Sequence, residues 1–530
     1  MSTAGVDAHL DPDRRAERLD RLERALCDSA VEHLVEMVLR RQAPDRYRAA
    51  AVDGSVEFVR ELDAAGRPSY RTTRVEGRDP LAHRASDHLV GHDSERAAAF
   101  PHRTVNAYPH AQDSIAQFFD APHSPDLVVT HTAAHHFDDH LGQHGSLGVV
   151  QARAPFIAAG AGIRADGVVD RSTRTVHVAP TIAAVLGVDP HPEATGPGGR
   201  SRPDALLRRQ DGDPETAVLT GETADHVVVF LLDGTNANLL FDVIDAGEAP
   251  HLAELVARGT AYRHGMFASL PTATLANHTT AVTGAHPGHS GILHNTWFDR
   301  SNGLTPDLLS MAEMFDAMVH LSPEVETVFQ AVRRARPDAW CSATFEFCDT
   351  GAQLSSFAEF RTGGLPDIPD FATITHVDPD IAAASAQYRF MSTIDHHSAT
   401  QTIEAWERTA GNPLPTISWC SLALTDEAAH ESGPHGAAAR ASIRDSDARV
   451  GDVLRAVERA GALDRTAVFV IADHGMEQND PSVTGTWTAA LEDTGIPHLD
   501  VGQGLVYLRP DPRSVSQDAP DPARSATQNA

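Results

Sequence analysis

The chain of 530 residues is poor in cysteine and in long apolar segments. Its four cysteines, Cys27, Cys341, Cys348 and Cys420, are too few and too scattered for a disulfide framework. No apolar run approaches the roughly 18 residues that a membrane helix needs. The first residues are charged and contain no apolar core of the kind found in secretory signals. We therefore expect a soluble, cytoplasmic protein that does not act in a membrane.

Basic residues are also scarce, because 43 arginines and lysines stand against 73 aspartates and glutamates, with a formal net charge of -30. A chain without a basic excess cannot neutralise a phosphate backbone, so we expect no stable binding of nucleic acid. Acidity of this kind keeps a protein surface solvated. It would repel an anionic substrate unless cations are bound locally, and a metal-lined pocket would supply them. The oligomeric state does not follow from the sequence.

The first part of the chain mixes helical and strand patterns. Residues 12–42 carry apolar side chains at helical spacing and predict one amphipathic helix. A Pro/Gly/Arg-rich stretch beginning at residue 191 predicts a linker, and the Pro/Asp/Ser-rich residues 511–530 predict a disordered tail. The remaining predicted elements before the linker are strands and turns over 50–75, buried strands over 126–132 and 154–160, and a helix over 176–188.

After the linker, apolar strands alternate with amphipathic helices. This order predicts a parallel sheet covered by helices on both faces. The elements are strands over 226–233, 415–426 and 466–475 and helices over 249–259 and 442–461.

Three aspartates follow directly on these strands, at Asp233, Asp426 and Asp473. The carboxyl ends of parallel strands are where such sheets gather their ligands. A single aspartate there would more often cap a helix or make a turn. Three of them, with His430 four residues after Asp426 and His474 next to Asp473, favour a metal site.

Thr274 lies where a proline-led loop enters a predicted helix. Taken alone, it would be an ordinary N-cap. A helix N-terminus also favours an anionic phosphate, and a hydroxyl close to a metal ion there could act as nucleophile. Thr272 is the competing hydroxyl in the same loop.

The block PTATLANHTTAVTGAHPGHSGILHN, together with LLDG, DEAAH and DHGM, resembles the type I phosphodiesterase/nucleotide pyrophosphatase family of the alkaline phosphatase superfamily. Ala276 departs from the proline that the family usually has. The resemblance implies an α/β/α sandwich with a mostly parallel central sheet and a cap insert over about 296–415. It also implies Thr274 as nucleophile, Asn295 as a phosphate-binding residue, and metal ligands at Asp233, Thr274, Asp426, His430, Asp473 and His474.

The family's last metal ligand is a histidine in a His-Gly element near its C-terminal end. Here the segment after Gly142 resembles that stretch and supplies His144, but it precedes the linker. We therefore expect a circularly permuted chain, in which residues 1–190 complete the catalytic fold, 191–224 connect, and 225–510 form the core. His498 would be the ligand in an unpermuted chain. The neighbours His131, His135, His136 and His140 are further rivals of His144.

The resemblance implies a hydrolase of phosphodiester or pyrophosphate bonds that acts on a small phosphorylated substrate through a phosphothreonine. It implies two divalent ions, for which nitrogen-plus-carboxylate ligation suits Zn2+, with Mn2+ or Fe as alternatives. Phosphonate or phosphomonoester hydrolysis on the same site remains open, as does a non-catalytic metal-binding relative. A sulfatase is disfavoured, because no cysteine lies in the Cys/Ser-x-Pro-x-Arg element of that class.

Overall fold

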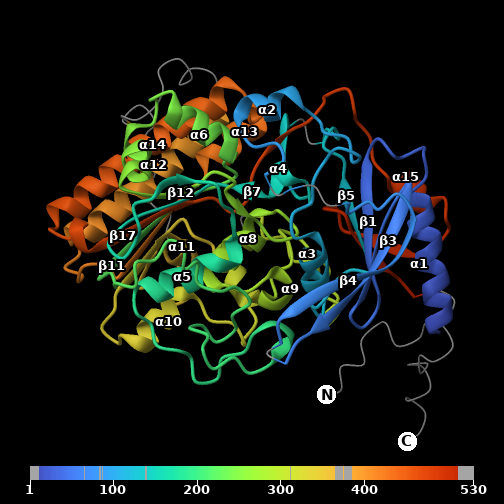
Figure 1. Cartoon of the computed structure of the whole chain (residues 1–530), viewed down its shortest axis with the longest axis horizontal. Helices are drawn as coiled ribbons and strands as arrows, with labels where there is room; N and C mark the ends of the chain where they lie inside the picture. Colours follow the sequence, from blue (N-terminus) through green and yellow to red (C-terminus); the bar gives the residue numbers. More distant parts are fainter. Residues whose placement is uncertain are drawn as a thin grey trace, which may run out of the picture.

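The computed structural model of the chain describes residues 11–510 except 65, 83, 84, 86, 138, 139, 311, 364–373 and 375–384. Two large sheets lie beside each other, one built mainly from residues after 225 and one mainly from residues before 132 (Figure 1). The predicted tail over 511–530 lies outside the described residues. Among the described helices, none combines the length and the apolar stretch that a membrane span requires.

The main sheet has eight strands, and β8 is antiparallel to both of its neighbours whereas all other neighbouring pairs are parallel. The predicted mostly parallel sheet is therefore present. In spatial order the strands are β15 (Leu354–Ser355), β14 (Cys341–Thr344), β16 (Ile417–Leu422), β11 (His226–Leu232), β17 (Thr466–Ile471), β8 (Phe156–Gly160), β12 (Gly259–Tyr262) and β9 (Gly167–Val169).

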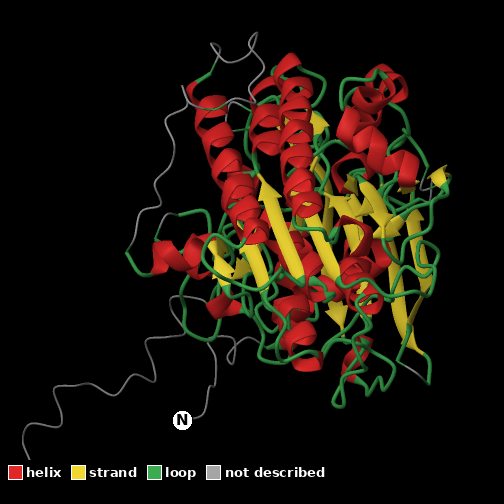
Figure 2. Cartoon of the chain, turned by 90° about the vertical axis from the view of Figure 1, so that its left-hand side faces the viewer, coloured by secondary structure: helices red, strands yellow, loops and turns green. Residues whose placement is uncertain are grey.

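Helices cover both faces of this sheet, as Figure 2 shows. Strand side chains point alternately to the two faces, so Val227, Val229 and Leu231 pack on one side, and Val228 and Phe230 on the other. The first face is covered by α5 (Val178–Val185), α8 (Thr274–Thr283) and α10 (Val328–Ala335). The second is covered by α6 (Ala237–Asp245), α7 (Pro250–Arg258), α12 (Ala386–Glu407), α13 (Leu424–Ser432) and α14 (Ala437–Arg459).

The second sheet has seven strands, each antiparallel to its neighbours. The helices α1 (Pro12–Leu26) and α3 (Ala111–Phe118) pack against it through separate apolar clusters. In order the strands are β19 (His498–Asp500), β20 (Leu505–Leu508), β5 (Leu127–His131), β1 (Val35–Ala43), β2 (Arg46–Ala51), β3 (Gly54–Leu62) and β4 (Pro68–Gly77). The two ends of the described chain therefore share one sheet.

Short elements connect the two sheets. β6 (Gly142–Gln143) pairs antiparallel with β18 (Glu477–Gln478), directly after the loop that contains Asp473. A three-stranded sheet joins β10 (Thr173–Arg174), β13 (Met266–Phe267) and β7 (Arg153–Ala154). The remaining helices are α2 (His92–Ala97), α4 (Val149–Ala152), α9 (Pro287–Ser290), α11 (Ser356–Arg361) and α15 (Thr488–Glu492), with 3-10 turns at Thr175–His177, Pro197–Gly199, Met314–His320 and Leu463–Arg465.

The single helix predicted over 12–42 is wrong in its second half. The helix α1 ends at Leu26, and Val35 and Val38 belong to β1. The Asp28 side chain accepts a hydrogen bond from the Ala30 backbone N–H and forms a turn. β-branched residues beyond that turn pair with β2 and β5 instead of continuing the helix.

The cap insert predicted over about 296–415 includes elements that belong to the main fold, and its role as a cap stays a prediction. Within that range β14 is a strand of the main sheet and α12 packs on its face. The predicted linker packs closely: Ala205, Leu207 and Val218 are buried in the main core.

Candidate metal centre

Three neighbouring strands of the main sheet bring the predicted carboxylates together. The strands β16, β11 and β17 lie side by side and run parallel. Asp233 and Asp473 follow β11 and β17, and Asp426 lies in the first turn of α13 after β16. Parallel strands end at the same edge, so the three carboxylates meet there.

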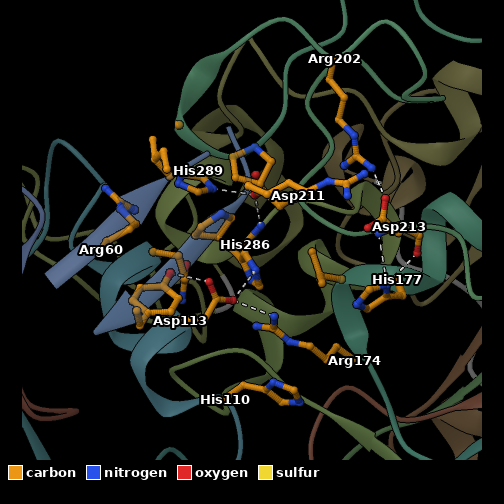
Figure 3. A pocket seen from close by; sticks show the side chains of 18 of the residues that line it. Arg60, His110, Asp113, Arg174, His177, Arg202, Asp211, Asp213, His286 and His289 are labelled. Atoms are coloured by element: carbon orange, nitrogen blue, oxygen red, sulfur yellow. Dashed lines mark hydrogen bonds and ion pairs between the residues drawn. The ribbon is translucent and has the colours of Figure 1, made fainter. Parts of the chain in front are cut away.

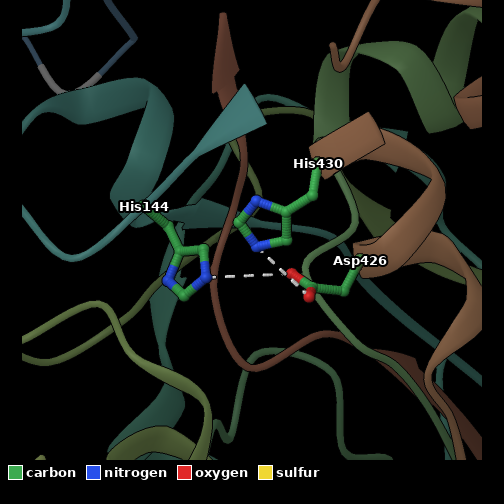
Figure 4. A group of neighbouring side chains, drawn as sticks. All are labelled: His144, Asp426 and His430. Atoms are coloured by element: carbon green, nitrogen blue, oxygen red, sulfur yellow. Dashed lines mark ion pairs between the residues drawn. The ribbon is translucent and has the colours of Figure 1, made fainter. Parts of the chain in front are cut away.

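His144, Asp426 and His430 form one group (Figure 4). The Nε2 atom of His430 lies 3.4 Å from Asp426 Oδ2, and that of His144 lies 3.9 Å from Asp426 Oδ1. The i,i+4 spacing places Asp426 and His430 on one face of α13. His144 comes from the loop after β6, almost 300 residues earlier in the chain.

Asp233, Asp473 and His474 form an adjoining group, beside Thr274. The Nε2 atom of His474 lies 3.1 Å from Asp473 Oδ2, 3.9 Å from Asp233 Oδ1 and 3.4 Å from Thr274 Oγ1. The rings of His474 and His144 stack with centroids 3.8 Å apart. Asp426 also lies within reach of Asp233 and His474, so the two groups are in contact.

The three histidines share one hydrogen-bonding pattern. In each, the Nδ1–H donates to a backbone carbonyl: His144 to Thr272 at 2.7 Å, His430 to Gly142 at 2.8 Å and His474 to Gly475 at 3.0 Å. This fixes the tautomer and leaves the Nε2 lone pair facing the carboxylates. Histidines that bind metal ions are usually oriented in this way.

Thr274 is the first residue of α8, and the N-cap is Ala273, so Thr274 is not an ordinary N-cap. The rival hydroxyl of Thr272 is engaged, because it accepts a hydrogen bond from Gly145 N–H and donates one to Ser146 O. Thr272 thus ties the His144 loop to the loop before α8, and the Thr274 hydroxyl is the one that faces His474.

Asn295 lies at the same helix end. Its Oδ1 accepts the Leu275 N–H at 3.2 Å, in place of a capping side chain of α8. The amide nitrogen of Asn295 makes no hydrogen bond with the described residues. It is therefore available to an anion bound at the start of α8.

The charges at this site fit divalent cations. Within the described chain, the ion pairs of Asp233, Asp426 and Asp473 are all with histidines, and Oδ1 of Asp233, Oδ1 of Asp426 and Oδ2 of Asp473 are buried without a hydrogen bond. Burial, with the Asp473 charge, raises the pKa of Asp233 to about 7, and burial raises that of Asp473 to about 6. Crowded, buried carboxylates without arginine partners are stabilised by bound metal ions.

The histidine pKa values differ with their partners. Burial holds the pKa of His144 well below its usual value and also lowers that of His474, which favours the neutral rings that ligate metals. Burial would do the same at His430, but Asp426 outweighs it and raises the pKa of His430 to about 9. A metal ion would have to displace a proton from that ring.

The profile of the type I phosphodiesterase/nucleotide pyrophosphatase family matches residues 227–528, which is more than half of the chain. The chain belongs to this family.

One curated relative shares limited sequence identity with this chain. Ectonucleotide pyrophosphatase/phosphodiesterase family member 1 of Mus musculus is 22% identical over 251 residues, which are 47% of this chain and 24% of that protein. The chain thus matches about a quarter of that relative's length.

Two solved structures show partial likeness. Murine ectonucleotide pyrophosphatase/phosphodiesterase 5, solved with AMP, aligns with a TM-score of 0.34 and 19% identity over 49% of this chain and 59% of that one. Phosphonoacetate hydrolase from Sinorhizobium meliloti, solved with phosphonoformate, aligns with a TM-score of 0.32 and 18% identity over 48% and 57%.

The rival histidines lie in other settings. His131 is hydrogen-bonded to the carbonyl of His144, His135 to Gly485 O and His136 to Asn479 Oδ1. The His140 ring lies 4.7 Å from that of His430, beside the candidate centre. His498 lies in β19 of the second sheet, paired with Leu508, and belongs to none of the potential metal-binding groups of the described residues.

Sequence reasoning missed two residues behind the carboxylates, His278 and Glu346. His278 is one turn after Thr274 in α8, and its Nδ1–H donates to Glu346 Oε2 at 2.9 Å. Burial opposes a charge on this ring, but Glu346 and Asp233 raise the pKa of His278 well above its usual value. The sequence feature that could have indicated Glu346 is its position between Phe345 and Phe347, where an acidic residue stands between two aromatic ones.

A cavity of about 620 Å³ lies away from these residues, between the second sheet and the segment 197–213 (Figure 3). None of the predicted site residues lines it. Its charged groups are largely paired with each other: Arg174 with Asp113 at 2.7 Å and His289 with Asp211 at 2.6 Å. We place the chemistry at the strand ends and not in this cavity, because three carboxylate oxygens without a hydrogen bond lie together there, and none of the described carboxylates that line the cavity has such an oxygen.

Proposed function

We propose that the protein is a divalent-metal-dependent hydrolase of phosphodiester or pyrophosphate bonds that works through a phosphothreonine intermediate. The observation that carries this proposal is the Thr274 hydroxyl at the N-terminus of α8, beside His474 and a cluster of three carboxylates, of which Asp233 and Asp473 are buried and Asp426 is partly buried. Family membership supports it. Phosphonate or phosphomonoester hydrolysis on the same site is the second candidate, because the same groups would hold those phosphoryl oxygens.

Seven residues have the donor chemistry for two ions. One ion would be held by Asp233, Thr274, Asp473 and His474, and the other by Asp426, His430 and His144. Mixed nitrogen and carboxylate donors suit Zn2+, with Mn2+ or Fe as alternatives. Bound ions would supply positive charge for the phosphoryl oxygens and lower the pKa of the attacking hydroxyl.

The chain's own groups would then orient the reaction. The start of α8 and the Asn295 amide bind the non-bridging phosphoryl oxygens. The Thr274 oxygen attacks phosphorus in line, a bond forms between them, and the bond to the leaving oxygen breaks. Water then cleaves the phosphothreonine, which releases phosphate or the phosphorylated product and restores the hydroxyl.

We also propose that the chain is circularly permuted relative to its family. The family profile begins at residue 227, whereas β8 and His144 come from residues before 161 and join the same sheet and the same cluster. On this proposal residues 1–190 complete the catalytic fold, 191–224 connect, and 225–510 form the core. Loops of the cap insert over about 296–415 would cover the substrate.

Replacing Thr274 by Ala tests the proposed nucleophile. We expect turnover of an aryl phosphodiester to fall at least about a thousandfold, because the attacking oxygen is lost. Zinc content should stay near that of the wild type. Thr280→Ala is the matched control, since Thr280 lies in the same helix and its hydroxyl donates to Ala276 O, away from the candidate centre.

Full activity of Thr274→Ala would contradict the assignment. A wild-type protein that binds metal but turns over no diester, monoester or phosphonate would instead be a non-catalytic relative.

A further inference from the structure

We infer that His278 and Glu346 form a positioning pair. The pair orients the Asp233 carboxylate through the oxygen that does not face His474, and so sets metal affinity and turnover. This inference rests on the proposed function, because it assumes that Asp233 is a metal ligand. Neither residue would touch substrate. Both act through the orientation of Asp233.

The two oxygens of Asp233 face different histidines. Oδ1 lies 3.9 Å from His474 Nε2, within the candidate centre, whereas Oδ2 lies 3.5 Å from His278 Nε2. One oxygen is thus available to a cation while the other faces His278. This is an ion-pair contact and not a hydrogen bond. A carboxylate in close electrostatic contact at one oxygen has less freedom to rotate away from an ion bound at the other.

Glu346 orients the His278 ring. Its Oε2 accepts the Nδ1–H of His278 at 2.9 Å and the hydroxyl of Ser421 at 3.0 Å. Its Oε1 accepts the Cys348 backbone N–H at 2.9 Å. With both oxygens engaged, the carboxylate cannot turn, and it holds the ring with Nε2 directed at Asp233.

Burial makes this arrangement rigid. His278 is 1% exposed and Glu346 is fully buried, and the Phe347 ring packs edge-on against His278 with centroids 5.3 Å apart. A carboxylate this deep in the protein is costly without a partner. Neither side chain reaches the surface, and the pair faces Asp233 of the candidate metal centre.

A third cation is the competing explanation. Ligand atoms of Asp233, His278 and Asp473 lie within 4.8 Å of one another, and a histidine backed by a carboxylate is also a metal-binding arrangement. Asp473 Oδ2, however, lies 3.1 Å from His474 Nε2 and 4.0 Å from His278 Nε2, so it turns towards the centre and away from His278. We therefore assign His278 to positioning.

The test compares His278→Gln, Glu346→Gln and the double variant with the wild type. Zinc stoichiometry and affinity are measured by chelator competition, and kcat and KM with an aryl phosphodiester. We expect His278→Gln to lower the affinity for one of the two zinc ions by about 10- to 100-fold. The value of kcat should fall by a similar factor, with KM within about threefold. Glu346→Gln should have a smaller effect, because a neutral acceptor remains.

The double variant should be no worse than His278→Gln alone, since Glu346 acts only through the ring. His226→Gln is the matched control: His226 is a buried histidine at the opposite end of β11 from Asp233, hydrogen-bonded to Pro415 O. Circular dichroism reports whether each variant folds. If His278→Gln does not fold, the zinc affinity and kcat of Glu346→Gln test the positioning pair instead.

Unchanged zinc affinity and kcat in the folded variants would overturn the positioning pair. Binding of three zinc ions by the wild type, reduced to two in His278→Gln, would overturn it in favour of a third cation. A wild type without metal and without turnover would instead refute the proposed function.

Discussion

At the residue scale, the histidines of this protein are sorted by what their second ring nitrogen contacts. His144, His430 and His474 donate Nδ1–H to neutral backbone carbonyls, whereas His278 donates to a buried carboxylate. Burial then favours neutral rings at His144 and His474, whereas a carboxylate in contact, Asp426 at His430 and Glu346 at His278, favours a charged ring. On the proposed function, some histidines of this site would therefore bind a metal ion and another would orient a ligand.

The candidate ligands were predictable from sequence because each occupies a recognisable place after a strand or in a short motif. The role of His278 was not, because it depends on Glu346, which is 68 positions away and whose side chain approaches only in the folded chain. The engagement of Thr272 with the His144 loop was hidden for the same reason.

Glu36 makes stability depend on pH. Burial raises its pKa to about 7 from an ordinary value of 4.5, although Tyr108 and Asn106 donate hydrogen bonds to it. Between these pH values the folded state holds a proton that the unfolded state has lost, so the free energy of unfolding falls as pH rises and levels off above about 7. The full effect is about 3 kcal/mol.

Glu36→Gln should remove this dependence. The variant should gain up to about 3 kcal/mol of stability relative to wild type between pH 4.5 and 7.5, measured by urea unfolding. Glu61→Gln, on the exposed side of β3, is the control and should follow the wild type. If the free energies of unfolding of Glu36→Gln and wild type differed by the same amount at every pH in this range, the prediction would be contradicted.

At the element scale, apolar strands were the most predictable part of the fold. The residues of β11, β16 and β17 are buried throughout, and such runs bounded by turns are typical of strands in parallel sheets. The region after Leu26 was mistaken for helix because its apolar positions fit both periods. The pairing of β1 with β2 and β5 shows that this region is a strand and not a helix.

The turn after β11 requires glycine for two reasons. Gly234 has φ +59°, and a Cβ there would lie 2.1 Å from Asp426 Oδ1. Gly234→Ala should therefore displace the Asp426 carboxylate and lower the affinity for the ion shared with His144 and His430. Metal titration measures this effect.

Gly247→Ala is the control for backbone strain alone. Gly247 has φ +74°, with nothing within 4 Å of its Cβ position. Both variants should lose about 1 kcal/mol of stability from the left-handed backbone, but only Gly234→Ala should lose metal affinity. Equal metal affinity in both would contradict the account.

At the scale of the whole molecule, segments that precede the predicted linker at 191–224 are interleaved with segments that follow it. β8 lies between β17 and β12 of the main sheet, and β19 and β20 complete the second sheet. Sequence patterns could predict the strands but not their neighbours, since pairing between distant segments leaves no local periodicity. Asp126 illustrates this, because it pairs with Arg15 and accepts the Leu508 N–H.

This closeness of the two ends predicts that the chain can be reordered. A chain that begins at residue 222, joins residue 510 to residue 11 by a short flexible linker, and ends at Gly221 should fold and keep its zinc content. The new ends would lie in an exposed turn, since residues 220–223 are exposed. Circular dichroism and metal analysis test it, and an unfolded or metal-free product would contradict the proposed arrangement.

The central claim is that the N-terminal half supplies the last ligand, His144. Zinc stoichiometry of His144→Ala beside His498→Ala tests it most directly. The account predicts that His144→Ala retains one zinc ion of two at low micromolar free zinc, whereas His498→Ala retains both. Two ions in His144→Ala, or the loss of one in His498→Ala, would contradict it.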